Sequence, residues 1–185
     1  MYIEVEPTPN PEVLKFLPGQ SVTGERIYDF PSADEHGGES PLAAQLFAVS
    51  GVQGVMLGAD FISVTRKPAV QWGDLRPTVL GAIMAHFQSG AAHINASAQQ
   101  QTLDDDEPED EITSKIRELL ELRVRPAVAM DGGDIQFHGF DKGIVYVTLR
   151  GACAGCPSAT VTLKMGIENM LRHYIPDVTE VRTVA

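Results

Sequence analysis

The sequence predicts an α+β protein made of two small α+β domains joined by a flexible acidic linker. The chain has 185 residues, which is more than one small domain usually needs. Both halves contain short strand-like runs and amphipathic helical stretches, and a polar, acidic stretch separates them. We therefore expect a first domain at 1–89, a linker at 90–110 and a second domain at 111–185.

Short strands are expected in the first domain. Strand-like runs occupy residues 2–6 and 13–17, and the proline cluster between them excludes regular structure there. Residues 52–66 contain two β-rich runs separated by Gly58–Asp60, which is typical of a hairpin.

Two helices are expected in the same domain. Ser40 can cap the first helix, and a proline follows it at a position that suits the first turn. This helix should end near Gly51. Asp74 can cap the second helix. Apolar residues recur there every four positions and form one stripe that we interpret as core: Leu75, Val79, Ile83 and Phe87.

The stretch 90–110 has the composition of a linker. Small and polar residues dominate its first part, and residues 104–111 are an acidic run interrupted by one proline. Low hydrophobicity and repulsion between like charges disfavour packing. We expect an extended, solvated tether.

The second domain is predicted to begin with an amphipathic helix. Its apolar residues follow helical spacing: Ile112, Ile116, Leu119, Leu120 and Val124. Pro126 should kink or interrupt this helix. In the turn that follows, we interpret Asp131 and Asp134 as caps of a tight glycine turn at the start of a strand.

A hairpin, a helix and a strand complete this domain. The hairpin turns at Asp141–Gly143, between two strand-like runs. A glycine-rich loop then leads into a helix that Pro176 stops, and a short strand is expected at 178–184. The apolar face of that helix comprises Leu163, Ile167, Met170, Leu171 and Tyr174. The predicted order is α-β-β-α-β.

The charge of the chain argues against some functions. The net charge is -11, so there is no general attraction to nucleic acid or anionic lipid. No apolar run is long enough to cross a bilayer, and the first residues show no basic or long apolar region. We expect no nucleic-acid or membrane partner, and a location in the bacterial cytoplasm or, alternatively, in the mitochondrial matrix after removal of a transit peptide.

The histidines are scattered, and no two have the short spacing of a helical metal pair. We interpret all five as surface or core imidazoles: His36, His86, His93, His138 and His173.

The only two cysteines, Cys153 and Cys156, lie three positions apart. This suits metal or redox chemistry in a reducing compartment better than a disulfide framework. Small neighbours leave the sulfurs approachable, and Gly151 and Gly155 can adopt conformations that aim amide N–H groups at them. Pro157 suits the first position of a helix, which would place Cys156 near the N-cap, where the thiolate is favoured.

Four interpretations of this pair compete. Two structural cysteines in a turn are one, and a thiol–disulfide oxidoreductase is another, although an antiparallel hairpin rather than a βαβ unit precedes the loop. A structural zinc site and an iron–sulfur cluster both normally take four protein ligands, and this chain supplies two thiols. Ligand counting therefore predicts a homodimer that shares one site. It does not separate iron from zinc, because sulfur suits both metals.

Several stretches resemble a known family. MDGGDI at 130–135 and GACAGCPSAT at 151–160 are similar to the C-terminal domain of NifU, which is found in Nfu-type proteins. TPNPEVLKF at 8–16 and FAVSGVQGVMLGADFISVTR at 47–66 resemble the N-terminal domain of Nfu proteins. Together the resemblances cover nearly the whole chain apart from the linker.

The resemblance implies an iron–sulfur cluster carrier or scaffold rather than an enzyme. It implies a [4Fe-4S] cluster, or alternatively [2Fe-2S], held between two protomers, with Cys153 and Cys156 as its metal ligands. Cluster assembly proteins would be the donors and apo iron–sulfur proteins the acceptors. The N-terminal domain would be an accessory module without ligands, which agrees with the absence of cysteine from residues 1–152.

Overall fold

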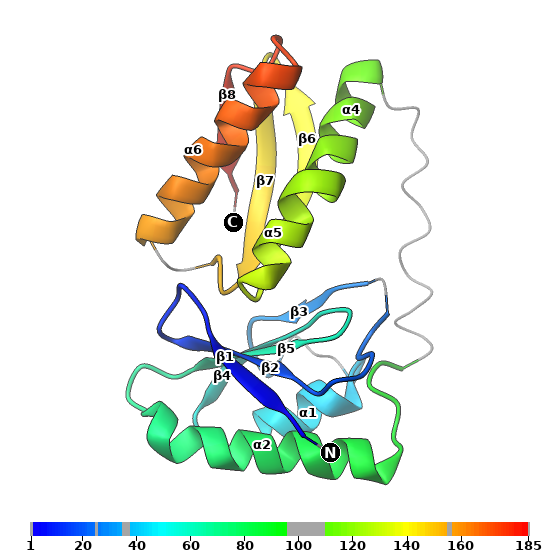
Figure 1. Ribbon diagram of the computed structural model, residues 1–185, viewed down its shortest axis with the longest axis vertical. Helices are drawn as coiled ribbons and strands as arrows, with labels where there is room; N and C mark the ends of the chain where they lie inside the picture. Colours follow the sequence, from blue (N-terminus) through cyan, green and yellow to red (C-terminus); the bar gives the residue numbers. More distant parts are fainter. Residues whose placement is uncertain (1, 25, 35–37, 96–109, 155–156, 185) are drawn as a thin grey trace. The chain divides into compact units, whose positions relative to one another are not determined.

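The chain folds into two compact units, an N-terminal unit of residues 1–105 and a C-terminal unit of residues 106–185 (Figure 1). The computed structural model describes residues 2–24, 26–34, 38–95, 110–154 and 157–184. Each unit combines helices with one sheet, so the predicted α+β class is confirmed. Most of the predicted linker lies outside the described residues, and the predicted domain boundaries stay predictions.

The N-terminal unit is built on an antiparallel sheet in the order β1-β2-β5-β4-β3. Its strands are β1 (Glu4–Pro7), β2 (Val13–Leu17), β3 (Tyr28–Phe30), β4 (Val52–Leu57) and β5 (Ile62–Arg66). The predicted strands and hairpin are confirmed. The sequence did not predict β3, because three residues carry no readable alternation and pairing with β4 alone holds them extended.

Two helices, α1 (Pro41–Phe47) and α2 (Trp72–Ser89), cover one face of this sheet (Figure 1). Ser40 caps α1 as predicted, because its hydroxyl accepts the Ala43 N–H at 2.9 Å. The prediction that Asp74 caps α2 is wrong, since Gln71 occupies the N-cap and makes no side-chain cap bond. The predicted apolar stripe of α2 packs into the core together with strand residues such as Phe16.

The residues directly after α2 fold back onto the N-terminal unit. Ile94 is 5% exposed and belongs to the core, and the Ser40 hydroxyl donates to the His93 carbonyl at 2.7 Å. His86 Nε2 lies 3.0 Å from His93 Nδ1. Burial lowers the pKa of both imidazoles, and the charge of His93 lowers that of His86 further. These two histidines therefore pair with each other in the fold.

The C-terminal unit begins with one continuous helical rod made of α4 (Glu111–Leu119), η1 (Leu120–Val124) and α5 (Arg125–Met130). The prediction that Pro126 kinks or interrupts this helix is confirmed in part, because the α-helical pattern is interrupted just before the proline while the chain stays helical. One turn of π-helix precedes the proline, and within it the Arg125 N–H bonds to the Leu120 carbonyl, five residues back. The wider turn tolerates a residue that has no N–H, so the helix continues to Met130.

A three-stranded sheet in the order β6-β7-β8 forms the other layer of this unit. The remaining elements are β6 (Gly133–Asp141), β7 (Ile144–Gly151), α6 (Pro157–Tyr174) and β8 (Glu180–Thr183). β6 and β7 are the predicted hairpin, and α6 carries the chain across so that β8 pairs parallel to β7. The predicted order α-β-β-α-β is confirmed.

The rod and α6 lie on the same face of this sheet and enclose the core between them (Figure 1). Ile116, Ile167 and Leu171 are buried in it as the helical spacing predicts. Tyr174 was predicted on the apolar face of α6, but it is 39% exposed and lies outside the core. The Arg123 guanidinium lies over its ring, 5.0 Å from the ring centroid. Among the described residues, no helix is both long enough and apolar enough to span a membrane.

Candidate functional site

The two glycine-containing motifs of the C-terminal unit meet at one end of the β6–β7 hairpin. Gly133, the first residue of β6, pairs with Gly151, the last residue of β7. The Ala152 N–H donates to the Gly132 carbonyl at 3.1 Å. Gly132 and Gly151 have φ of 74° and 59°, a backbone conformation that favours glycine. The DGGD turn (131–134) and the start of the cysteine loop (151–156) therefore form one structural element.

Cys153 lies on this element with its side chain turned inward. It is 7% exposed and packs into the core of the C-terminal unit. Its N–H donates to the Arg150 carbonyl at 3.3 Å, and its carbonyl accepts the Thr160 hydroxyl, from the first turns of α6, at 3.2 Å. The loop is thus held from the strand and from the helix. The helix α6 begins at Pro157 as predicted, whereas Cys156 lies outside the described residues.

Cys153 packs directly against the backbone of Gly133. A Cβ added at position 133 would overlap Cys153 Sγ and would lie 3.0 Å from Cys153 Cβ and 3.1 Å from the Arg150 carbonyl oxygen. No residue larger than glycine fits without moving the cysteine. The sequence interpretation, a tight turn at the start of a strand, missed this contact, because residues 133 and 153 are far apart along the chain.

The surroundings of Cys153 favour the neutral thiol. Burial raises its pKa to about 11, and the negative charges of Asp131 and Asp134 act in the same direction. In the metal-free protein at neutral pH the Cys153 thiol is therefore protonated. A metal that binds there must displace the proton, so ligation is coupled to proton release.

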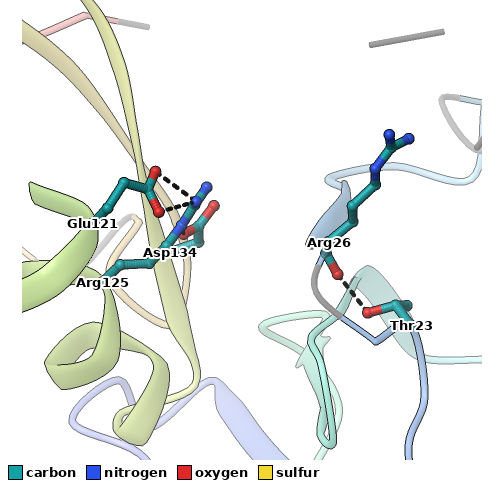
Figure 2. Close-up of polar contacts among 5 residues, drawn as sticks. All are labelled: Thr23, Arg26, Glu121, Arg125 and Asp134. Carbon is teal, nitrogen blue, oxygen red and sulfur yellow. Dashed lines mark hydrogen bonds and ion pairs between the residues drawn. The ribbon is translucent and has the colours of Figure 1, made fainter. Parts of the chain in front are cut away.

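Asp134 is a buried carboxylate held by an ion pair. Its side chain is 2% exposed, and its Oδ1 accepts from Arg125 Nε at 2.9 Å. Arg125 Nη1 also bonds both carboxylate oxygens of Glu121 at 2.6 Å (Figure 2). Burial alone would lower the pKa of Arg125, but the bonds and charges of Asp134 and Glu121 outweigh it and raise that pKa. The interpretation of Asp134 as a simple cap is therefore wrong.

The sequence contained only a weak signal for this ion-pair network. Arg125 and Asp134 are nine residues apart, on different elements, and no helical or strand spacing relates them. Glu121 and Arg125 are four apart, which is the spacing of a helical ion pair. Asp131 lies at the C-terminal end of α5 and acts on Cys153 through its charge.

The described residues alone do not form a complete metal site. No group of three or more His, Cys, Asp or Glu side chains within the described ranges could hold a metal ion. Among the described residues, the candidate site therefore offers one thiol, that of Cys153. A metal site built on this thiol would need further ligands from elsewhere.

Comparison with known families identifies both units. Residues 3–90 match the family described as "Scaffold protein Nfu/NifU N terminal", and residues 116–182 match the "NifU-like domain". The two matched ranges include the DGGD turn and the cysteine loop.

Individual relatives match over the whole chain. Proteins named "NFU1 iron-sulfur cluster scaffold homolog, mitochondrial" from Drosophila sechellia and Drosophila ananassae are 46% and 45% identical over 188 and 185 residues. The matches cover 100% of this chain but only 65% and 64% of those relatives. A solution NMR structure of a NifU-like protein from Saccharomyces cerevisiae shows 26% identity, 52% coverage of this chain, 86% coverage of that chain and a TM-score of 0.47.

Replacing Gly133 should destabilise the C-terminal unit. Gly133→Ala forces Cys153 or the loop to move, and we expect a loss of about 1–3 kcal/mol in the free energy of unfolding, measured by urea titration. Gly139→Ala is the matched control, because it lies on the same strand with nothing within 4 Å of the added Cβ. Equal stability of the two variants would contradict the close packing of Cys153 against Gly133.

The raised pKa of Cys153 should appear in its reactivity. In a metal-free Cys156→Ser variant, Cys153 is the only cysteine, and its rate of alkylation by iodoacetamide should rise with pH up to about 11. In urea the same profile should level off near the ordinary value of 9.0, because unfolding removes the burial and the aspartate charges. If the alkylation rate of the folded protein levels off at the same pH as in urea, the pKa of Cys153 is not raised by folding.

Proposed function

Since this chain belongs to the Nfu/NifU family, we propose that it is an iron–sulfur cluster scaffold or carrier. It holds one [4Fe-4S] cluster between the cysteine loops of two protomers and passes that cluster to apo-proteins. The observation that carries the proposal is the loop itself, in which Cys153 packs against the backbone of Gly133 and is bonded from α6 through Thr160. The names of the fruit-fly relatives, whose whole length this chain only partly spans, point to the same scaffold role.

The ligand count requires a second copy of the chain. Iron–sulfur clusters normally take four thiolates, and the chain contains only Cys153 and Cys156. Two protomers that bring their loops together supply four. A [2Fe-2S] cluster would take the same four ligands, so the thiol count supports a shared cluster and leaves its type to iron analysis.

The charge distribution of the chain permits this association. Residues 111–185 contain nine basic and nine acidic side chains, so the net charge of -11 resides in residues 1–110. No charged side chain occurs between 151 and 163, that is, in the cysteine loop and the first turns of α6. Two C-terminal units can therefore approach through their loops without strong repulsion.

An apolar stripe continues from the loop along α6. Val161 and Met165, four residues apart, are 57% and 60% exposed. Exposed apolar side chains next to an incomplete ligand site suit contact with the second protomer. We assign this stripe to the dimer interface that forms around the cluster.

Transfer requires ligand exchange only. A thiolate of the acceptor forms a bond to iron as a cysteine thiolate of the scaffold leaves. This exchange repeats until the cluster has moved to the acceptor, and no substrate is oxidised or reduced. Cluster assembly proteins are the donors and apo iron–sulfur proteins the acceptors. The fruit-fly relatives are named mitochondrial, which supports the mitochondrial matrix rather than the bacterial cytoplasm.

Metal analysis of protein purified without air tests this proposal. The protein should contain about four irons and four acid-labile sulfides per dimer, and its mass in solution should be that of a dimer. Cys153→Ala and Cys156→Ala should each abolish most of the bound iron, because each removes two of the four thiolates from the dimer.

Other outcomes would contradict it. Zinc without sulfide would indicate a structural zinc dimer. Metal-free protein that reduces a model disulfide catalytically would indicate a thiol–disulfide enzyme. Full iron and sulfide content in Cys153→Ala would show that this cysteine is not a ligand.

The α6 stripe should control dimerisation. Met165→Glu places one negative charge per protomer at the interface, and we expect the reconstituted protein to remain monomeric and to retain little cluster. Analytical ultracentrifugation before and after anaerobic reconstitution measures this. Tyr2→Glu, the same kind of change at an 82% exposed side chain of the N-terminal unit, should leave dimerisation intact. Normal loading and dimerisation of Met165→Glu would exclude the stripe from the interface.

A further inference from the structure

An ion-pair network of Glu121, Arg125 and Asp134 lies next to Cys153 in the fold. Its buried member, Asp134, is the neighbour in sequence of Gly133, against which Cys153 packs. Asp134 directly follows Gly133, whose backbone touches Cys153, and its charge acts on that thiol. Figure 2 shows that Arg125 contacts Asp134 from the helical rod and is itself held by Glu121. A continuous chain of contacts therefore joins the rod to the candidate cluster ligand.

A carboxylate as buried as Asp134 is stable in its charged form only with a partner. Removing one member of a buried ion pair leaves an unpaired charge, which is strongly destabilising. Arg125 is the partner that the structure provides: its Nε lies 2.9 Å from Asp134, and its Nη1 is bonded by the carboxylate of Glu121. The start of β6, including Gly133, is thus tied to the rod by this pair.

The negative charge of Asp134 also matters for the ligand. A cluster held by four thiolates is negatively charged, so an uncompensated carboxylate beside it opposes binding and makes reduction harder. Arg125 lies 2.9 Å from Asp134, so its positive charge offsets part of the carboxylate charge that acts on Cys153.

We propose that Arg125 is a positioning residue for the ligand Cys153: by pairing with Asp134 it holds Gly133 against the sulfur and offsets part of the carboxylate charge beside the cluster. The cluster part of this proposal rests on the proposed function, whereas the packing part concerns the metal-free protein. The π-helical turn belongs to the same device, because it carries Arg125 at its end while the helix continues past Pro126.

Charge-balanced variants test the proposal. Arg125→Gln leaves Asp134 unpaired, so the bound cluster should be lost to a chelator about tenfold faster and its reduction potential should become more negative. The double variant Arg125→Gln/Asp134→Asn removes both charges and should return both quantities towards those of the wild-type protein. Arg123→Gln is the matched control, because Arg123 lies on the same turn and contacts Tyr174 instead.

A second comparison does not depend on the folding of Arg125→Gln. If Arg125 acts through Asp134, the double variant should behave like Asp134→Asn alone, because arginine is dispensable once the carboxylate is neutral. A further tenfold loss of cluster in the double variant relative to Asp134→Asn would overturn the proposal. So would a folded Arg125→Gln protein with the release rate and potential of the wild type, since a merely structural pair would leave the potential unchanged.

Metal-free protein separates this proposal from the proposed function. Hydrogen exchange of the Ala152 amide, which bonds to the Gly132 carbonyl, should be about tenfold faster in Arg125→Gln and should slow again in the double variant. If wild-type protein binds no cluster but the variants show this pattern of exchange rates at Ala152, the proposed function fails and the positioning role stands. If exchange at Ala152 is unchanged in Arg125→Gln, the positioning role fails.

Discussion

The contact between Cys153 and the backbone of Gly133 is the constraint on which the site depends. It requires glycine at 133, and it joins two loops that are twenty residues apart in sequence. The pairing of Gly133 with Gly151 and the bond from the Ala152 N–H to the Gly132 carbonyl make the same junction from the backbone. Cys153 is therefore held in place by the end of the β6–β7 hairpin, although it lies in a loop.

The elements around this junction serve to hold it. Thr160 in α6 bonds the Cys153 carbonyl, and Arg125 on the helical rod bonds Asp134 beside Gly133. The π-helical turn allows the rod to contain both Arg125 and Pro126 without ending. In the C-terminal unit, α6, the helical rod and the β6–β7 pair all contribute contacts that hold the segment around Cys153. Residues 111–185 carry no net charge.

Local patterns accounted for most of the fold, and their failures share a cause. The hairpins, the apolar stripe of α2 and the cap at Ser40 depend on neighbours a few residues apart, and the structure confirms them. Asp74 as a cap was wrong, because α2 starts earlier. Pro126 interrupts only the α-helical pattern, because a wider π-helical turn precedes it and the chain stays helical to Met130. β3 escaped prediction because only its pairing with β4 makes it a strand.

The sequence by itself determined which residues are the candidate metal ligands and that one chain has too few thiols for a four-thiolate site. It has two cysteines, three apart, and a thiol count needs no coordinates. Only the tertiary structure decided the surroundings of Cys153: its burial, its packing against Gly133, the two aspartates that raise its pKa and the arginine that pairs one of them. Spacing along a chain reports neighbours within one element, whereas these contacts join different elements and exist only after folding.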